Sequence, residues 1–131
     1  MRAWVVIMVM GAGLGAYSLR APKGWRAHTI RPQPGHVLTT LAPRSGDAAI
    51  QIYVYPGSGP PSDDALPDVG CHRVTIGGIR GRRCRTLPGG APVTILQAGG
   101  RTYRISAQPG VPSATYDRVV RSFRLRRPPA P

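Results

Sequence analysis

The two cysteines of the chain, Cys71 and Cys84, flank a glycine pair in the stretch CHRVTIGGIRGRRC. If Gly77 and Gly78 are the central residues of a two-residue hairpin turn, counting outward along both strands places Cys71 opposite Cys84. This is a non-hydrogen-bonded position, where Cα atoms lie about 4.5 Å apart and a disulfide can form. The spacing therefore predicts a structural disulfide, which contributes about 3 kcal/mol to stability in the chain-entropy description.

The chain contains few residues that could support metal, redox or catalytic chemistry. The two cysteines are too far apart for a C-x-x-C redox pair, and a zinc site needs two more ligands. The histidines, His28, His36 and His72, lie in separate segments. The chain has five Asp and no Glu, and it lacks a nucleophile elbow, a phosphate loop and a dinucleotide fingerprint. We therefore expect a protein that is not an enzyme and that uses no metal and no cofactor.

Arginine is the other residue type with a chemical role to explain. The chain carries 18 basic residues against five acidic ones, for a net charge of +13. The register that pairs the cysteines also places Arg73 opposite Arg82, a like-charge pair that suits an exposed face or an anion held between the two guanidinium groups. The candidate anion-binding residues are Arg73, Arg80, Arg82, Arg83 and Arg85, with Arg83 on the other strand face from Arg80 and Arg82.

A second basic cluster lies near the C-terminus. It comprises Arg118, Arg121, Arg124, Arg126 and Arg127. For both clusters the alternative interpretation is a solvated basic surface that keeps the protein soluble.

The N-terminal segment MRAWVVIMVMGAGLGAYSLR combines Arg2, a short apolar run and a series of small residues. This pattern is typical of a secretory signal peptide, with cleavage after Gly15 or Ala16. One alternative is an uncleaved anchor, because the uncharged run is at the lower length limit for spanning a bilayer. Another is a buried first strand of a cytosolic fold. We expect residues 1–16 to be a signal peptide or N-terminal membrane anchor, and the protein to be exported to the periplasm, the extracellular space or the outward side of a membrane.

Short segments rich in alternating or β-branched residues predict an antiparallel sheet. The expected strands are 17–21, 24–30, 37–43, 48–56, the two arms of the cysteine hairpin, and a further hairpin over 92–108 that turns at Gly99-Gly100. Within 48–56, the side chains of Ile50, Ile52 and Val54 share one face. A polar loop over 57–70, with one helical turn at 62–66, connects this strand to the cysteine hairpin.

One helix is expected, in PSATYDRVVRSFRL near the C-terminus. Ser113 is the predicted N-cap. Tyr116, Val119, Val120 and Phe123 recur at helical spacing and predict one apolar stripe, while Arg118, Arg121 and Arg124 fall on a different face.

These elements predict a single α+β domain over residues 17–127, in which a twisted antiparallel sheet of about six to seven short strands packs against the C-terminal helix. Residues 128–131 are a Pro-rich tail.

Three stretches in the same order resemble PsbP-like domains, the exported bacterial relatives of a photosystem subunit. They are YSLRAPKGWRAH, VTIGGIRGRRC, and RTYRISAQPG followed by YDRVVRSFRL. The resemblance covers residues 17–125 and implies an α-β-α sandwich that serves as a non-enzymatic binding or assembly module. The segment between YVYP and CHRV is short where that family carries a long helix, so we expect one face of the sheet to be less covered.

Two classes of function follow. The first is an exported, non-catalytic binding or scaffold domain at the cell envelope. The alternative is a sequence-independent binder of nucleic acid or another anionic polymer through the arginine clusters. The expected partners are an anionic envelope polymer or acidic lipid, with membrane contact through residues 3–19 if the segment stays uncleaved. Nucleic acid is a weaker expectation, because the chain has no nucleic-acid motif and only 6% aromatic residues for base stacking.

Overall fold

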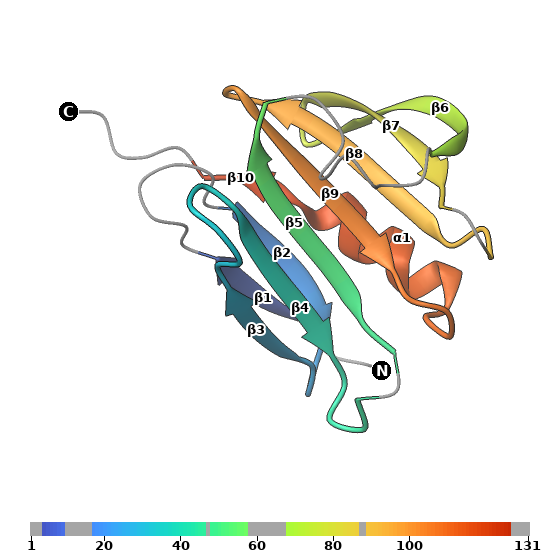
Figure 1. Cartoon of the computed structure of the whole chain (residues 1–131). Coiled ribbons are helices and arrows are strands. Elements are labelled where there is room, and N and C mark those ends of the chain that lie inside the picture. The colour runs from blue at the N-terminus through green and yellow to red at the C-terminus, as the bar shows by residue number, and fades with distance from the viewer. Residues whose placement is uncertain (1–3, 10–16, 47, 58–67, 87–88, 127–131) are drawn as a thin grey trace.

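The computed structural model describes residues 4–9, 17–46, 48–57, 68–86 and 89–126. Within these residues, ten strands form two antiparallel sheets, and one helix lies between the ninth and tenth strands near the C-terminus (Figure 1). The predicted fold class, a single α+β domain with an antiparallel sheet packed by a C-terminal helix, is confirmed in this form. The strand number exceeds the predicted six to seven. Trp4–Val9 was expected to belong to a signal peptide or anchor, and Arg124–Leu125 was expected to belong to the helix, but both form strands.

Seven strands form the large sheet, in the order β3-β4-β5-β9-β8-β7-β6, and all neighbours are antiparallel. Their bounds are β3 Arg26–Ile30, β4 Val37–Ala42, β5 Ile50–Pro56, β6 Val69–Ile76, β7 Ile79–Arg85, β8 Pro92–Ala98 and β9 Arg101–Ala107. The predicted face of β5 is confirmed, because Ile50, Ile52 and Val54 are all buried. The loop between β5 and β6, including the helical turn expected at 62–66, lies mostly outside the described residues.

Both predicted two-residue turns are confirmed. In β6–β7 the turn glycines Gly77 and Gly78 have φ of 57° and 82°, the left-handed region that such a turn requires. Val74 lies opposite Gly81 and Arg73 opposite Arg82, as the spacing predicts. The β8–β9 hairpin likewise turns at Gly99 and Gly100, pairing Leu96 with Tyr103 and Thr94 with Ile105.

Helix α1, Ser113–Ser122, buries the predicted apolar stripe: Tyr116, Val119, Val120 and the following residue Phe123. The N-cap prediction was wrong by one residue. Pro112 occupies that position, and no side chain caps the helix. The Pro112 carbonyl accepts the first helical hydrogen bond, from the amide of Tyr116 at 3.1 Å, so Ser113 already belongs to the helix.

The small sheet has the order β1-β2-β10, with β1 Trp4–Val9, β2 Tyr17–Pro22 and β10 Arg124–Leu125. All six residues of β1 pair with β2, and Trp4 and Ile7 pack against the core. Part of the expected signal or anchor segment therefore forms a strand of the domain, while its cleavage stays a prediction. Residues 127–131, which include Arg127 and the predicted tail, lie outside the described residues.

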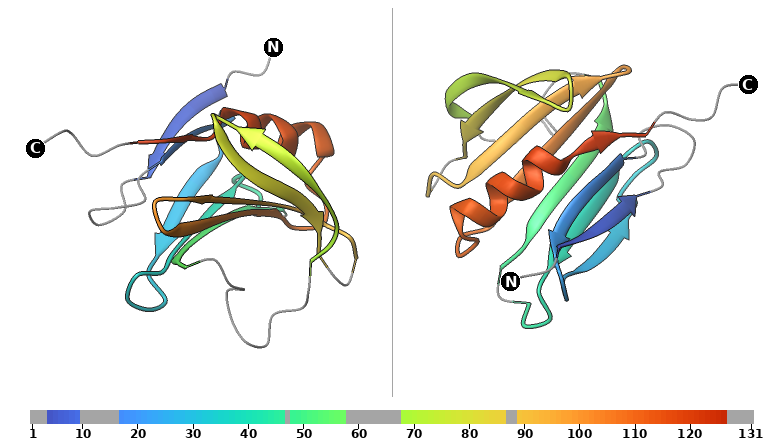
Figure 2. Two further views of the ribbon diagram at one scale, coloured as in Figure 1. Left: turned by 90° about the horizontal axis from the view of Figure 1, so that it is seen from above. Right: turned by 180° about the vertical axis from the view of Figure 1, so that it is seen from behind.

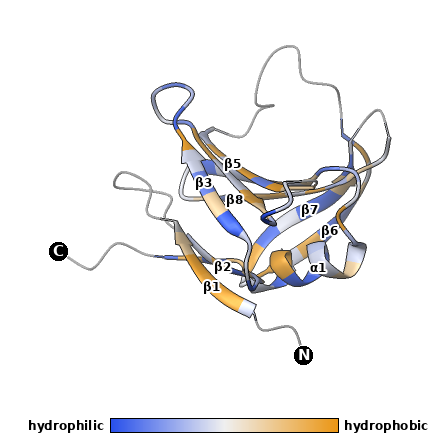
Figure 3. Cartoon of the chain, turned by 90° about the horizontal axis from the view of Figure 1, so that it is seen from below, coloured by the Kyte–Doolittle hydropathy of each residue, from blue (hydrophilic) through white to orange (hydrophobic). Residues whose placement is uncertain are grey.

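The helix and the small sheet lie side by side on one face of the large sheet (Figure 2). Tyr17 and Leu19 from β2 join Tyr116, Val119 and Phe123 in the main core between these layers. The opposite face of the large sheet carries a smaller buried cluster. Figure 3 shows β1 as a mostly hydrophobic strand at the edge of this arrangement. No helix in the described part of the chain is long and apolar enough to cross a membrane.

Candidate anion-binding groove

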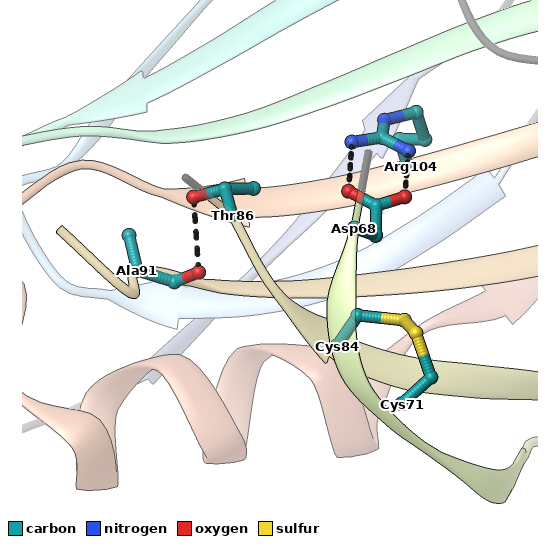
Figure 4. Close-up of polar contacts among 6 residues, drawn as sticks. All are labelled: Asp68, Cys71, Cys84, Thr86, Ala91 and Arg104. Atoms are coloured by element: carbon teal, nitrogen blue, oxygen red, sulfur yellow. Dashed lines mark hydrogen bonds and ion pairs between the residues drawn. A yellow bond between two sulfur atoms is a disulfide. The ribbon is translucent and has the colours of Figure 1, made fainter. Parts of the chain in front are cut away.

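The predicted disulfide is present between Cys71 and Cys84, whose Cα atoms lie 4.1 Å apart (Figure 4). The register of β6 and β7 shifts between Val69 and His72, immediately beside the bridge. The disulfide thus holds the two strands together at the point where their regular hydrogen-bonded pairing is interrupted. It is compatible with an exported protein, because disulfides persist in oxidising compartments.

Three of the five candidate anion-binding residues are brought together in one groove. Arg73, Arg80 and Arg82 line an open space of about 690 Å³ over the β6–β7 hairpin and β8. Arg80 and Arg82 share a strand face because they are two residues apart, and Arg73 joins them because it lies directly across from Arg82. Thr75, Ile95 and Gln97 also line the groove.

Arg83 and Arg85 do not belong to this groove. Arg83 lies on the helix side of the sheet, as alternation predicts, and forms an ion pair with Asp117 of α1. Its guanidinium also lies 5.2 Å from the centre of the Tyr116 ring, at cation–π distance. The side chain of Arg85 lies beside Gly70, where an added Cβ would come within 3.1 Å of two guanidinium nitrogens. Gly70 has a φ of 66°, so glycine suits both this turn of the backbone and the close approach of Arg85.

Neither described carboxylate pairs with a groove arginine. Of the five aspartates, Asp68 and Asp117 are within the described residues, and each pairs with another arginine. Asp68 accepts two hydrogen bonds from Arg104, at 2.9 and 3.1 Å (Figure 4). Burial alone would lower the pKa of Arg104, but its hydrogen bonds to Asp68 raise the pKa overall. Among the described residues, no ion pair neutralises Arg73, Arg80 or Arg82.

One residue that lines the groove, Ile95, belongs to a buried apolar cluster. Cys84, Val93 and Ile95 form the smaller buried cluster, and Ile95 is 2% exposed although it lies directly opposite Arg82. The disulfide and this cluster fix the backbone from which the arginines project. A fixed backbone lowers the conformational entropy lost when these side chains bind a ligand.

Sequence reasoning missed a row of residues that extends from the groove across the same face. The register places Arg82, Ile95, Arg104 and Tyr53 next to one another on four neighbouring strands. Next to this row His36 forms a 2.7 Å hydrogen bond with the Tyr53 hydroxyl, and its ring stacks on Tyr55 with centroids 6.0 Å apart. Alternation in β5 predicted that Tyr53 and Tyr55 share a face, but no local pattern marked His36 as their partner.

The described residues contain no group of three or more His, Cys, Asp or Glu side chains that could hold a metal ion. What the groove offers chemically is a set of planar, permanently charged donors. Guanidinium groups of this kind bind phosphate, sulfate and carboxylate oxygens with two hydrogen bonds each.

Comparison with known proteins gives a fold similarity without a function. No family model and no curated protein matches the chain. Solved structures with a similar fold include a crystal structure of a protein from Bacteroides thetaiotaomicron VPI-5482, with a TM-score of 0.52 and 16% sequence identity. The match covers 85% of this chain and 45% of that one, so this chain spans less than half the length of its structural relative. At this identity the similarity shows the shared fold alone.

Proposed function

We propose that the protein is a non-catalytic binding domain of the cell envelope, and that its ligand is an anionic polymer held in the groove of Arg73, Arg80 and Arg82. The observation that carries the proposal is the convergence of these three guanidinium groups on one strand face with no carboxylate partner in the described residues. Directly opposed like charges repel, and an anion between them offsets that repulsion. The arrangement is therefore better suited to a bound state than to an empty one.

The groove favours a polymer over a small anion because its positive charges are distributed over two strands. Arg80 and Arg82 are two residues apart along β7, and Arg73 adds a charge from β6. A chain of regularly spaced phosphates, sulfates or carboxylates can offer a separate anionic group to each of the three. The contacts are to charge rather than to base edges, so we expect binding that is indifferent to nucleotide sequence.

The envelope location rests on separate support. The Cys71–Cys84 disulfide is compatible with an oxidising compartment. The resemblance to PsbP-like domains implies an exported binding or assembly module without enzymatic activity. Nucleic acid is the second candidate ligand, and it shares the charge chemistry of an envelope polyanion.

The test replaces Arg73, Arg80 and Arg82 with Gln, which removes three charges and keeps a polar side chain with two of the three methylene groups. Binding to fluorescent heparin and to two oligonucleotides of unrelated sequence is measured by anisotropy. We expect the groove variant to lose at least tenfold in affinity for every polyanion. The control replaces three exposed arginines outside the groove, Arg26, Arg31 and Arg44, with Gln. Equal losses in both variants would contradict a defined groove, and strong preference for one oligonucleotide would contradict binding through charge alone.

A further inference from the structure

A second arginine-lined pocket lies where β2, α1 and β10 meet. It encloses about 440 Å³ and is lined by five exposed arginines: Arg20, Arg118, Arg121, Arg124 and Arg126. The predicted C-terminal cluster therefore does converge, except for Arg127, which lies outside the described residues. Arg20 joins the cluster because its backbone amide donates a 2.7 Å hydrogen bond to the Ser122 hydroxyl at the end of the helix.

Two of these arginines are held in position by contacts of their own. Arg124 donates hydrogen bonds to the carbonyl oxygens of Arg121 and Phe123, at 2.8 and 2.7 Å, at the C-terminus of α1. The guanidinium of Arg118 lies 4.2 Å from the centre of the Trp4 ring. In the described residues, neither Asp68 nor Asp117 pairs with a pocket arginine. The pocket is thus a partly preorganised cluster of positive charge.

Apolar side chains of β1 lie next to this positive pocket. Val6 and Met8 are each 56% exposed, and β1 pairs them with Arg20 and Ser18, which also line the pocket. Ile7, on the opposite strand face, packs toward the core instead. Exposed apolar groups beside a ring of cations match a membrane surface, where lipid phosphates lie directly above the acyl chains.

We propose that this surface docks on a bilayer containing acidic phospholipids, with a lipid phosphate in the arginine pocket and Val6 and Met8 at the acyl-chain boundary. The site is distinct from the polymer groove, because no residue lines both. A nucleic acid or soluble phosphate would satisfy the arginines but leave Val6 and Met8 in water, so the lipid explains both features. The proposal requires that residues 4–9 remain in the mature protein.

The experiment measures co-sedimentation of the full chain with vesicles of phosphatidylglycerol and phosphatidylcholine, against vesicles of phosphatidylcholine alone. Three variants are compared: a pocket variant with Arg20, Arg121 and Arg126 changed to Gln, the groove variant with Arg73, Arg80 and Arg82 changed to Gln, and an apolar variant with Val6 and Met8 changed to Ser. The two arginine variants remove the same charge, and Arg118 and Arg124 stay in place to preserve their packing. Circular dichroism checks that each variant is folded.

We expect the full chain to prefer acidic vesicles. Each arginine near an acidic bilayer strengthens binding about fivefold, so the pocket variant should lose about 100-fold in vesicle partitioning. The groove variant should lose less than about threefold, because none of its three arginines lines the pocket that holds the lipid phosphate. The apolar variant should lose several-fold with its charge intact.

Several results would overturn the lipid assignment. Absence of binding to acidic vesicles would do so, as would equal losses in the pocket and groove variants. Undiminished binding by the apolar variant, combined with competition by inorganic phosphate alone, would identify a soluble anion as the ligand. An intact mass showing a mature N-terminus at Ala16 or Tyr17 would remove β1 and with it the proposal. None of these outcomes bears on polyanion binding by the groove, which is measured with a different ligand.

Discussion

The hydroxyl of Tyr116 connects the helix to the centre of the large sheet. It donates a 2.6 Å hydrogen bond to the Ile105 carbonyl and lies 2.7 Å from the Thr94 hydroxyl. The side chain is fully buried in the main core, and this burial raises the pKa of Tyr116 to about 12. Burial also raises the pKa of Tyr17. Because of these two residues, the unfolding free energy of the domain depends on pH in the alkaline range.

This coupling predicts a loss of stability above pH 10. Because the folded-state pKa of Tyr116 exceeds the unfolded value of 10.0, the protonated form stabilises the fold below pH 10, and this contribution is lost as pH rises toward about 12. When the pH is raised from 8 to 11, the unfolding free energy of the unmodified protein should therefore fall by about 1.4 kcal/mol more than that of the Tyr116→Phe variant. Urea denaturation at both pH values measures the difference, and identical losses would show that the Tyr116 hydroxyl does not titrate as its burial implies.

The cysteine pair gives a second prediction for single residues. Protein recovered from its native compartment should yield one cross-linked peptide containing Cys71 and Cys84 when digested without reductant. Changing both cysteines to Ser should lower the unfolding free energy by about 3 kcal/mol, since the bridge restricts the unfolded chain. Two thiols that alkylate readily in freshly isolated protein would contradict the oxidised state and weaken the argument for export.

At the scale of elements, α1 contributes to the stability of the domain through one buried face. Phe123, at the C-terminal end, is fully buried and stacks on Tyr17 with ring centroids 5.2 Å apart. Phe123→Ala should cost about 3–5 kcal/mol, because it leaves a cavity between the helix and the small sheet. Arg121→Ala, on the exposed face, should change stability by less than about 0.5 kcal/mol. Comparable losses in thermal or urea unfolding would mean that α1 does not pack by this face.

Some elements could be predicted from the sequence because their signals are local. The Gly77-Gly78 turn and the cysteine spacing select the same register, and the spacing of Tyr116, Val119 and Phe123 identifies the buried helix face. β1 shows the limit of such reasoning. An apolar run of this length fits a signal peptide, an anchor or a strand equally well, and its pairing with β2 depends on tertiary contacts.

The same limit applies to the groove. Alternation correctly separated Arg83 from Arg80 and Arg82, because strand periodicity is a property of the backbone. The partners Asp117 and Asp68 could not be predicted, since they come from segments distant in sequence. The convergence of Arg20 with the C-terminal arginines was missed for the same reason, as it follows from the way β2 docks beside α1.

At the scale of the whole molecule, the net charge of +13 is distributed over two separate surfaces. The two described aspartates pair with Arg83, on the helix side of the large sheet, and with Arg104, on the same face as the groove. The groove arginines and the pocket arginines line two spaces that share no residue, and all of them are exposed. Under the two proposals, one surface holds a polyanion and the other contacts a membrane.

The most direct test of the central claim is the salt dependence of heparin binding by the unmodified protein and by the variant with Gln at Arg73, Arg80 and Arg82. Each contact between an arginine and a polymer anion releases condensed counterions, which contributes about 0.7 to 0.9 to the slope of log K against log salt concentration. We expect the slope of the groove variant to be shallower by about 2 to 3, with the fold unchanged. The variant at Arg26, Arg31 and Arg44 should retain the original slope. Equal slopes of log K against log salt concentration for the groove variant and the unmodified protein would contradict the groove as a polyanion site. Absence of heparin binding at low salt would contradict it as well.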